Sequence, residues 1–280
     1  MEQKAKVGNL LLAALPPADL EFLVPHFRTV RLERDAVLVR SGDVIERIHF
    51  PLSGLIAFIM DMPDGQTVAT SIVGNEGAVG LLSTLGPARF PMTAVVRVAG
   101  RALEISSTRF QGALGHCSAL NGAVQTHTRA LMAQFQHVAA CNALHSVEGR
   151  MARWLLHVHD RVDGDVLPLT QETLAEFLGV RRTTVTHVVC KLRASGAIRF
   201  NRRSSIEIDR PRLEAAACEC YELMRRRIDR IVLAEEMEPP GHARPVDDPH
   251  AQTPLLAKAG EVHRRTRTTH GGIGQRSRGH

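Results

Sequence analysis

The sequence has no long hydrophobic run and no recognisable export signal. Its longest apolar stretch, Leu52 to Met60, is interrupted by Ser53 and Gly54 and falls short of the roughly 20 residues that a helix needs to cross a bilayer. The first residues, Met1 to Lys4, lack the basic-then-apolar order of a secretion signal. We therefore expect a cytoplasmic protein with no membrane partner.

Cysteine is also scarce, with five residues in 280 and no CxxC pair. An odd count argues against a secreted disulfide framework, and the missing CxxC argues against a structural zinc site. Cys218 and Cys220 are two residues apart, so on a helix they would point to different faces. We expect ordinary reduced thiols and no metal, with redox sensing by a cysteine as the alternative.

Common enzyme motifs are missing too. The sequence contains no GxGxxG, P-loop, HExxH or GxSxG pattern, so no catalytic residues are assigned and the chain is not expected to be an enzyme. What it does contain is a hydrophobic fraction of 44%, enough for folded cores, and a length that suits two domains.

Basic residues are in excess, and they are unevenly placed. The net charge is +6, which favours a polyanionic partner without identifying one. From Arg181 to Arg203 there are seven Arg or Lys residues and no Asp or Glu. Such a run is often only a solvated basic face, so the motif inside it decides its meaning.

The N-terminal part has the pattern of a β-structure. After a short helix over 10–24, brief β-branched runs follow one another from Val30 to Ile105, separated by turn signals such as Asp64-Gly65. The expected strands are 36–39, 47–50, 54–60, 67–73, 94–98 and 102–105. Many short strands at this spacing predict an antiparallel β-roll of the jelly-roll kind over residues 1–107.

Helical periodicity replaces this pattern over residues 108–145. Apolar residues recur there at intervals of three and four, a spacing typical of a coiled-coil seam. They are Leu120, Val124, Leu131, Phe135 and Val138. We interpret the segment as a dimerisation helix, and the alternative is a helix that packs on its own β-roll.

The segment from Thr170 to Ile198 predicts a helix-turn-helix. Thr170 can cap a first helix, and Gly179 permits the left-handed turn that ends it. A second helix would bury Val185, Val188, Val189 and Leu192. Its outer face would then carry Arg182, Thr183, Thr186 and His187. Since the outer N-terminal face of a recognition helix reaches base edges in the major groove, these four are the predicted base readers.

A β-hairpin wing is expected to follow. Two short strands flank Arg202 and Arg203, which places both cations at the tip, where DNA phosphates are the nearest partners. Thr170, Arg181 and Lys191 complete the predicted phosphate contacts. A final helix starts at Asp209-Arg210-Pro211 and runs towards Ile231, so the winged helix-turn-helix domain spans 146–237. The polar tail 238–280 is expected to be disordered.

This order of parts resembles the Crp/Fnr family of bacterial regulators over roughly residues 10–230, most specifically from Thr170 to Ile198. The string 147–152, Val-Glu-Gly-Arg-Met-Ala, also resembles the start of the family's hinge and helix. The resemblance implies an α+β fold with an N-terminal β-roll, a long dimerisation helix and a C-terminal winged helix-turn-helix. It places Arg182, Thr183 and His187 at the family's principal base-reading positions. The family often has Glu and Arg in place of the last two, so the operator sequence does not carry over.

The effector site departs from the family's cAMP-binding members. By resemblance, a Gly-Glu pair should hold the ribose and an Arg-Ser pair the phosphate, but Gly80 is followed by Leu81, and Met92-Thr93 stands at the second position. A buried phosphate without its guanidinium would be poorly compensated. The family's iron–sulfur branch uses N-terminal cysteines, and the first here is Cys117. Neither cofactor is expected, while a haem ligand among the fourteen histidines stays open.

These observations together predict a dimeric, sequence-specific transcription regulator. It would bind a palindromic operator, contact RNA polymerase and respond to an unidentified signal in the β-roll. The two alternatives are an enzyme and a cyclic-nucleotide-binding module without DNA activity. The basic segment 181–193 argues against the second alternative, as do Leu81 and Met92.

Overall fold

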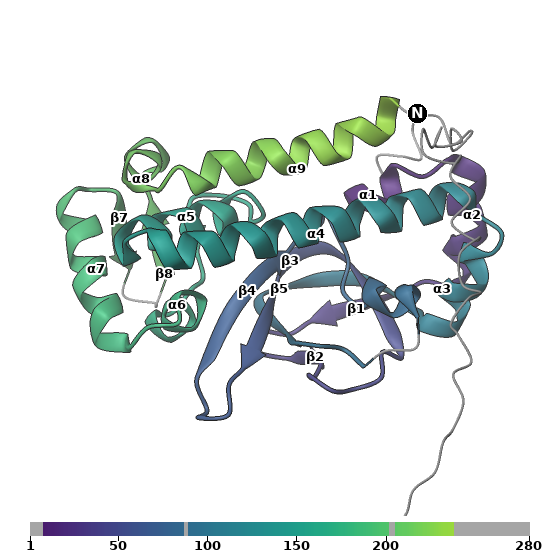
Figure 1. The fold of residues 1–280 in the computed structure, drawn as a ribbon, viewed down its shortest axis with the longest axis horizontal. Coiled ribbons are helices and arrows are strands. Elements are labelled where there is room, and N and C mark those ends of the chain that lie inside the picture. The colour runs from purple at the N-terminus through teal and green to yellow at the C-terminus, as the bar shows by residue number, and fades with distance from the viewer. Residues whose placement is uncertain (1–7, 87–88, 202–204, 238–280) are drawn as a thin grey trace, which may run out of the picture. The chain divides into compact units, whose positions relative to one another are not determined.

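The computed structural model describes residues 8–86, 89–201 and 205–237 (Figure 1). An N-terminal antiparallel sheet is followed by one long helix and a C-terminal group of shorter helices, which confirms the predicted fold class. The tail expected to be disordered and the wing-tip residues Arg202 and Arg203 lie outside the described residues. Within the described ranges, no helix is long and apolar enough to cross a membrane.

Before the sheet, a helical segment is divided by Pro16-Pro17 into α1 (Leu10–Ala13) and α2 (Pro17–Leu23), with a 3-10 turn, η2 (Val24–His26), after them. The main sheet has the strand order β1-β5-β3-β4, and β2 also pairs with β5. Its strands are β1 (Arg28–Leu32), β2 (Val37–Val39), β3 (Arg47–Asp61), β4 (Thr67–Val73) and β5 (Thr93–Ser106). A 3-10 turn, η3 (Leu81–Leu85), lies between β4 and β5.

Two of the predicted strand boundaries in this region were wrong. The expected strands 47–50 and 54–60 are one strand, β3, and 94–98 and 102–105 are likewise one strand, β5. Gly54 has a left-handed φ of +85°, and the Cβ of any other residue at Gly100 would lie 2.2 Å from the Ser53 carbonyl oxygen. The two glycines therefore allow β3 and β5 to stay paired across the shifts in register near Gly54. Neither glycine ends a strand.

The long helix α4 (Ser118–Leu144) follows the short α3 (Ser107–Leu114) and runs along the sheet (Figure 1). All five residues of the predicted dimer seam face the chain's own core. Leu120 and Val124 pack in a cluster with α1 and α2, Leu131 and Phe135 pack on the sheet, and Val138 joins the C-terminal core. The structure thus uses the more apolar side of α4 within the chain, as the alternative interpretation holds.

The C-terminal elements are α5 (Val147–His159), α6 (Gln171–Leu178), α7 (Arg182–Ala194), α8 (Arg210–Ala216) and α9 (Cys220–Met237). A small sheet of order β6-β8-β7 joins them, formed by β6 (Val166–Leu167), β7 (Ile198–Asn201) and β8 (Ser205–Ile208). The expected single helix after β8 is interrupted, because Ala217 has extended backbone angles of φ −74° and ψ 149°. This break separates α8 from α9.

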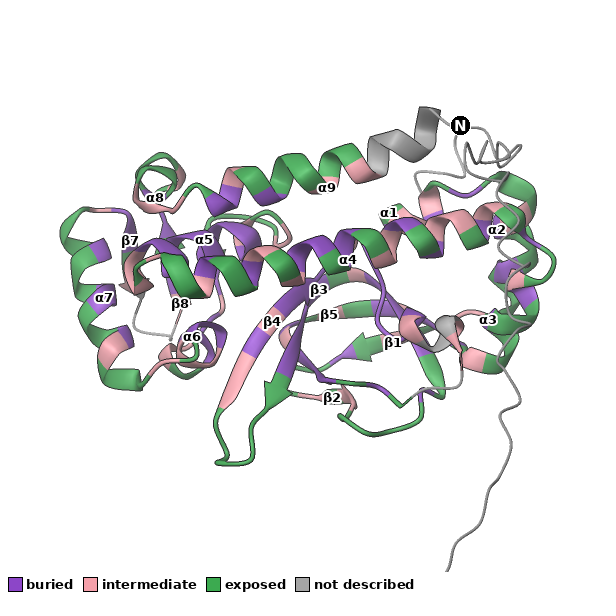
Figure 2. Cartoon of the chain, in the orientation of Figure 1, coloured by how far each residue is buried: buried purple, intermediate pink, exposed green. Residues whose placement is uncertain are grey.

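One hydrophobic cluster joins the sheet to the C-terminal helices. It contains Ile59 and Ile72 from the sheet together with Trp154 of α5 and Phe177 of α6. The rings of Trp154 and Phe177 are 5.1 Å apart, and both side chains are fully buried. Figure 2 shows the buried residues as a stripe along α4 and through α5. The helix-turn-helix therefore packs on a hydrophobic core that it shares with the N-terminal sheet.

Candidate nucleic-acid interface

The first helix of the motif begins and ends as the sequence predicts. The Thr170 hydroxyl accepts a hydrogen bond from the Thr173 backbone amide at 3.2 Å, which caps α6. Gly179 ends α6 in the left-handed conformation, with φ 61° and ψ 42°. Any Cβ there would also lie 3.1 Å from a methyl carbon of Val68 on β4, so both the turn and the packing favour glycine.

The second helix, α7, presents one polar side to solvent. Val185, Val188, Val189 and Leu192 are buried. The four predicted base readers, Arg182, Thr183, Thr186 and His187, are all exposed on the first two turns, and Arg181 is the exposed N-cap residue. The structure therefore brings these five predicted residues together on one surface, which we call the α7 face.

Two residues that the sequence analysis missed contact the α7 face from α6. Glu172 forms an ion pair with Arg182, with 2.6 Å between Oε1 and Nη1, and both side chains are more than half exposed. The Thr186 hydroxyl donates to Gln171 Oε1 at 3.2 Å. The basic run has no acid of its own, but the helix-turn-helix fold itself places the start of α6 beside the start of α7. From that geometry, the contacts of Gln171 and Glu172 with α7 could have been predicted.

The predicted phosphate contacts lie around the rim of this face. Thr170 is half-buried at the α6 cap, and Lys191 is exposed on α7, 3.5 Å from a carboxylate oxygen of Glu148 on α5. Strands β7 and β8 form the wing, and Arg199 on β7 lies 3.9 Å from Glu207 on β8. Arg182, Lys191 and Arg199 therefore each lie close to a carboxylate of the chain itself.

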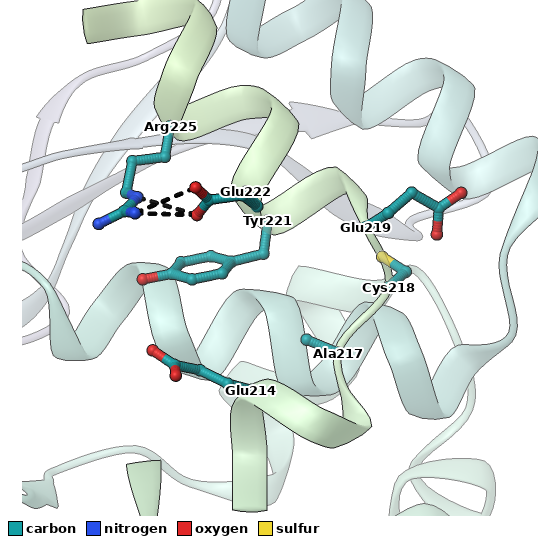
Figure 3. Close-up of a pocket in the computed structure, with 7 residues that line it drawn as sticks. All are labelled: Glu214, Ala217, Cys218, Glu219, Tyr221, Glu222 and Arg225. Atoms are coloured by element: carbon teal, nitrogen blue, oxygen red, sulfur yellow. Dashed lines mark hydrogen bonds and ion pairs between the residues drawn. The ribbon is translucent and has the colours of Figure 1, made fainter. Parts of the chain in front are cut away.

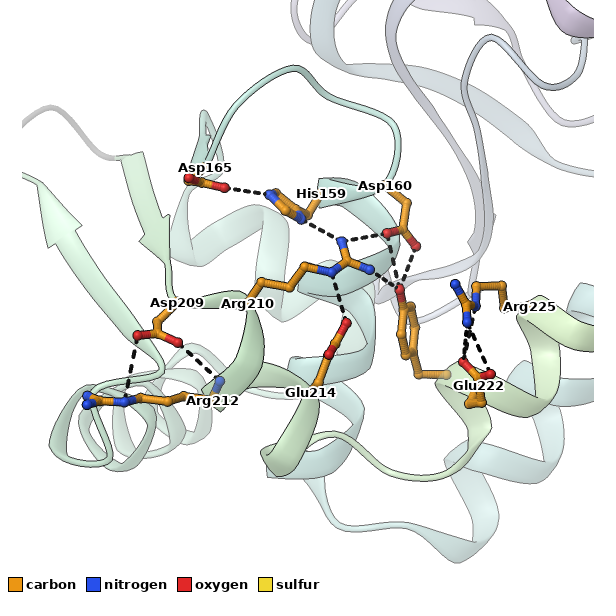
Figure 4. Close-up of polar contacts among 10 residues, drawn as sticks. His159, Asp160, Asp165, Asp209, Arg210, Arg212, Glu214, Glu222 and Arg225 are labelled. Carbon is orange, nitrogen blue, oxygen red and sulfur yellow. Dashed lines mark hydrogen bonds and ion pairs between the residues drawn. The ribbon is translucent and has the colours of Figure 1, made fainter.

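A polar network fixes the elements behind the motif (Figure 4). Arg210 of α8 donates to Asp160 Oδ1 at 2.9 Å and to the Tyr221 hydroxyl at 2.6 Å. Burial and the neighbouring Asp160 raise the pKa of Tyr221 to about 12, so it remains a neutral donor at ordinary pH. These bonds join the end of α5 to α8 and α9, the two helices that follow the wing.

The β-roll contacts the motif through charge as well as packing. Arg97 on β5 makes two hydrogen bonds from Nη2 to the carboxylate of Glu176 on α6, at 2.5 and 2.6 Å, and pairs with Asp35 at 2.6 Å. Arg161 after α5 contacts Glu76 after β4 at 2.6 Å. Burial raises the pKa of Glu176 despite the Arg97 charge, which marks this contact as substantially desolvated.

At the positions where the family's cAMP-binding members hold their ligand, the side chains are buried in the core or already hydrogen-bonded within the chain. Leu81 is buried in the N-terminal core and Met92 in the β-roll core. The Thr93 hydroxyl donates to Asp61 Oδ2 at 2.6 Å and accepts from the Ser41 amide at 3.2 Å. Gly80 has φ +100°, and a Cβ there would lie 2.9 Å from the Arg47 carbonyl oxygen.

Family models match both halves of the chain. Residues 29–116 match a cyclic nucleotide-binding domain, and residues 149–216 match a Crp-like helix-turn-helix domain, so the two models together cover more than half of the sequence. A similar protein is the CRP-like cAMP-activated global transcriptional regulator of Mycobacterium tuberculosis. The two are 22% identical over 214 residues, which are 74% of this chain and 96% of that one.

Solved structures show the same fold. FixK2 from Bradyrhizobium japonicum aligns with a TM-score of 0.60 at 16% identity, over 69% of this chain and 98% of its own. The c-di-GMP responsive global regulator CLP from Xanthomonas campestris aligns with a TM-score of 0.59 at 18% identity, over 69% of this chain and all of its own. The order of sheet, long helix and helix-turn-helix is thus shared along nearly the whole of these relatives.

Proposed function

The chain belongs to the Crp/Fnr family of DNA-binding transcription regulators, and we propose that it acts as a homodimer that reads a palindromic operator through α7. The family is one of regulators and not of enzymes. The observation that carries the proposal is the α7 face, on which Arg182, Thr183, Thr186 and His187 are exposed around the first two turns.

The roles of these residues follow from their positions. Arg182 is the first residue of α7, from which its guanidinium fork can reach the two acceptors of a guanine in the major groove. Thr183, Thr186 and His187 follow on the same face. We assign Thr170, Arg181 and Lys191 to phosphate contacts, together with Arg202 and Arg203, on which the structure gives no information because they lie outside the described residues.

The second copy would bind on the outer face of α4. Exposed or half-exposed residues recur there at alternating intervals of three and four, which is the spacing of a coiled-coil seam. They are Gly122, Gln125, Arg129, Met132, Gln136, Ala139 and Ala143, of which Gln136 also accepts a hydrogen bond from Arg227 of α9 at 3.2 Å. Met132 is 53% exposed, and the small alanines permit close helix approach. The inner seam, with Leu131, is occupied by the chain's own core, so we propose the outer seam as the dimer interface.

The β-roll is proposed to receive a signal other than cAMP. The Mycobacterium relative is named as cAMP-activated, but here Leu81 and Met92 are buried and Thr93 is already bonded to Asp61. No guanidinium stands at the Met92 position to balance a buried phosphate. Calorimetric titration with cAMP should therefore give no saturable heat, and a micromolar dissociation constant would contradict this assignment. We further propose that the protein acts in the cytoplasm and contacts RNA polymerase.

Selection from a random duplex library tests the proposed function directly. Two α7 helices related by a dimer axis would enter the major groove about 34 Å apart, so the enriched sequence should be two-fold symmetric with half-sites about one helical turn apart. The matched control is a variant in which Arg182, Thr183 and His187 are all replaced by Ala. If this variant enriches the same sequence, or if the wild type enriches none, the proposal fails.

A further inference from the structure

Four potential metal ligands meet where α4 ends and α9 begins. They are Cys141, His145, Cys218 and Cys220, and their ligand atoms all lie within 4.8 Å of one another. Cys141 Sγ is 3.5 Å from Cys218 Sγ, and Cys220 Sγ is 3.5 Å from His145 Nδ1. Around a tetrahedral zinc ion, with Zn–S and Zn–N bonds of about 2.3 and 2.0 Å, ligand atoms are separated by roughly 3.5–3.8 Å. The spacing of the cluster is close to that requirement.

Local structure explains how two distant sequence segments supply these ligands. Cys141 and His145 are four residues apart at the C-terminal end of α4, so they share one side of the helix. Cys218 lies in the connection between α8 and α9, where its amide contacts the Gly149 carbonyl at 3.4 Å, and Cys220 is the first residue of α9. Figure 3 shows Cys218 beside Glu219 on this connection.

The fold around these residues does not support the expectation that the chain binds no metal. That expectation assumed that Cys218 and Cys220 lie on one helix and point apart, but the extended backbone at Ala217 breaks that helix. It also required a CxxC pair, whereas the pair here is completed by a cysteine and a histidine from 73–79 residues earlier in the chain. Cys3His is an established ligand set for structural zinc.

A buried cation without a hydrogen-bond partner supplies an independent observation. The Arg153 side chain is fully buried, and its Nε, Nη1 and Nη2 have no hydrogen-bond partner. Its guanidinium carbon lies 4.7 Å from the centre of the Trp154 ring, and its charge interacts electrostatically with both Cys141 and Cys220. Arg150, also buried, donates at 3.4 Å to the carbonyl oxygen of Asn142, the residue after Cys141. Buried charges persist when an opposite charge compensates them.

Metal binding would provide that compensation. Three thiolates and one divalent ion carry a net charge of −1, next to two buried guanidinium groups. A disulfide between Cys141 and Cys218 would be neutral and would not compensate the charge of Arg153. The compact cage, with all atoms within 4.8 Å, suits a single ion. Thiolate and imidazole ligands select zinc-class ions over magnesium or calcium.

We propose that Cys141, His145, Cys218 and Cys220 bind one zinc ion in a tetrahedral site that joins the end of α4 to the start of α9. The ion holds the α8–α9 connection against α4 and α5, and thereby fixes the helix-turn-helix domain to the long helix. This site is separate from the α7 face, and its existence does not depend on the proposed operator binding.

Metal analysis of the full chain, purified without chelators, tests the site. We expect about one zinc per chain, and after exchange with Co²⁺ the intense visible absorption of a tetrahedral cobalt–thiolate centre. Cys218→Ser and Cys220→Ser should each lose most of the bound metal. Cys190→Ser is the matched control, because Cys190 is an exposed thiol on α7 outside the cluster, and it should keep its full metal content.

Thiol protection in the wild type covers the case in which a variant fails to fold. In the native protein, Cys141, Cys218 and Cys220 should resist alkylation until a chelator is added, and mass spectrometry should then find these three newly modified. Metal-free native protein that gives no cobalt spectrum would overturn the proposal. A Cys141–Cys218 disulfide in anaerobically purified, metal-free protein, or equal metal loss in Cys190→Ser, would overturn it as well.

Discussion

Arg97 of β5 holds Glu176 of α6 with two hydrogen bonds from one nitrogen, at 2.5 and 2.6 Å, and so connects the β-roll to the helix-turn-helix. The side chains are only 14% and 16% exposed. A signal that changes the position of β5 would therefore act directly on α6, whose neighbour α7 carries the proposed DNA contacts.

A double-mutant cycle of Arg97→Gln and Glu176→Gln measures how strongly this contact couples the two regions. Because the pair is largely desolvated, we expect a coupling energy of about 1–3 kcal/mol in urea unfolding. The matched control is Arg182 with Glu172, an ion pair at a similar distance but more than half exposed, which should give less than about 0.5 kcal/mol. Equal coupling in the two cycles would refute a structural role for the Arg97–Glu176 contact.

The two sides of α4 should respond differently to substitution. Ala139→Glu places a charge in the proposed outer seam and should convert the dimer to a monomer in sedimentation at micromolar concentration, with the fold intact. Leu131→Ala instead removes a buried side chain from the β-roll core, and should cost about 2–4 kcal/mol of unfolding free energy.

Comparing the oligomeric state of Ala139→Glu with the stability of Leu131→Ala distinguishes the outer seam from the buried side of α4. If Ala139→Glu remains dimeric, the outer seam is not the interface. A wild-type chain that sediments as a monomer would remove the dimer proposal altogether.

Buried histidines should make the fold less stable as the pH falls below neutrality. Burial, followed by the charges of Arg161 and Arg153, lowers the pKa of His157 well below 6.5, and burial also lowers the pKa of His49 and His127. The unfolded chain takes up protons near pH 6.5 while the folded chain does not. The free energy of unfolding therefore decreases from pH 7.5 to pH 5.5.

His157→Gln isolates one part of this dependence. Each such histidine contributes a slope of up to about 1.4 kcal/mol per pH unit, so the variant should show a shallower dependence by up to that amount in urea unfolding. Identical slopes in His157→Gln and the wild type would show that this histidine is not held neutral by the fold.

How far the sequence predicts the fold depends on how local each signal is. The helix-turn-helix could be predicted because its cap, its glycine turn and its buried valines lie within a short segment. The β-roll could be predicted as a class, but not its strand bounds, since Gly54 and Gly100 look like turn residues and in fact serve β-bulges. Whether a glycine forms a turn or a β-bulge depends on packing with strands that are distant in the sequence.

Contacts between segments that are distant in the sequence could not be predicted. Nothing near Arg97 in the sequence indicates Glu176, 79 residues away, and nothing near Cys141 indicates Cys218. The periodicity of α4 identified an apolar seam, but periodicity alone could not tell a partner's helix from the chain's own sheet. The sequence did not indicate the proposed outer seam, because its alanines and glutamines resemble an ordinary solvated face.

If α7 reads bases, the affinity of Arg182→Ala for operator and for random DNA should show it most directly. Loss of a two-acceptor contact to guanine should weaken operator binding by about 1–3 kcal/mol and relax the preference at one base pair, with little change on random DNA. Lys191→Ala is the comparison: a lost phosphate contact should weaken both DNAs alike and lower the salt dependence by about one unit of slope. If Arg182→Ala weakens random DNA as much as the operator, Arg182 does not read a base.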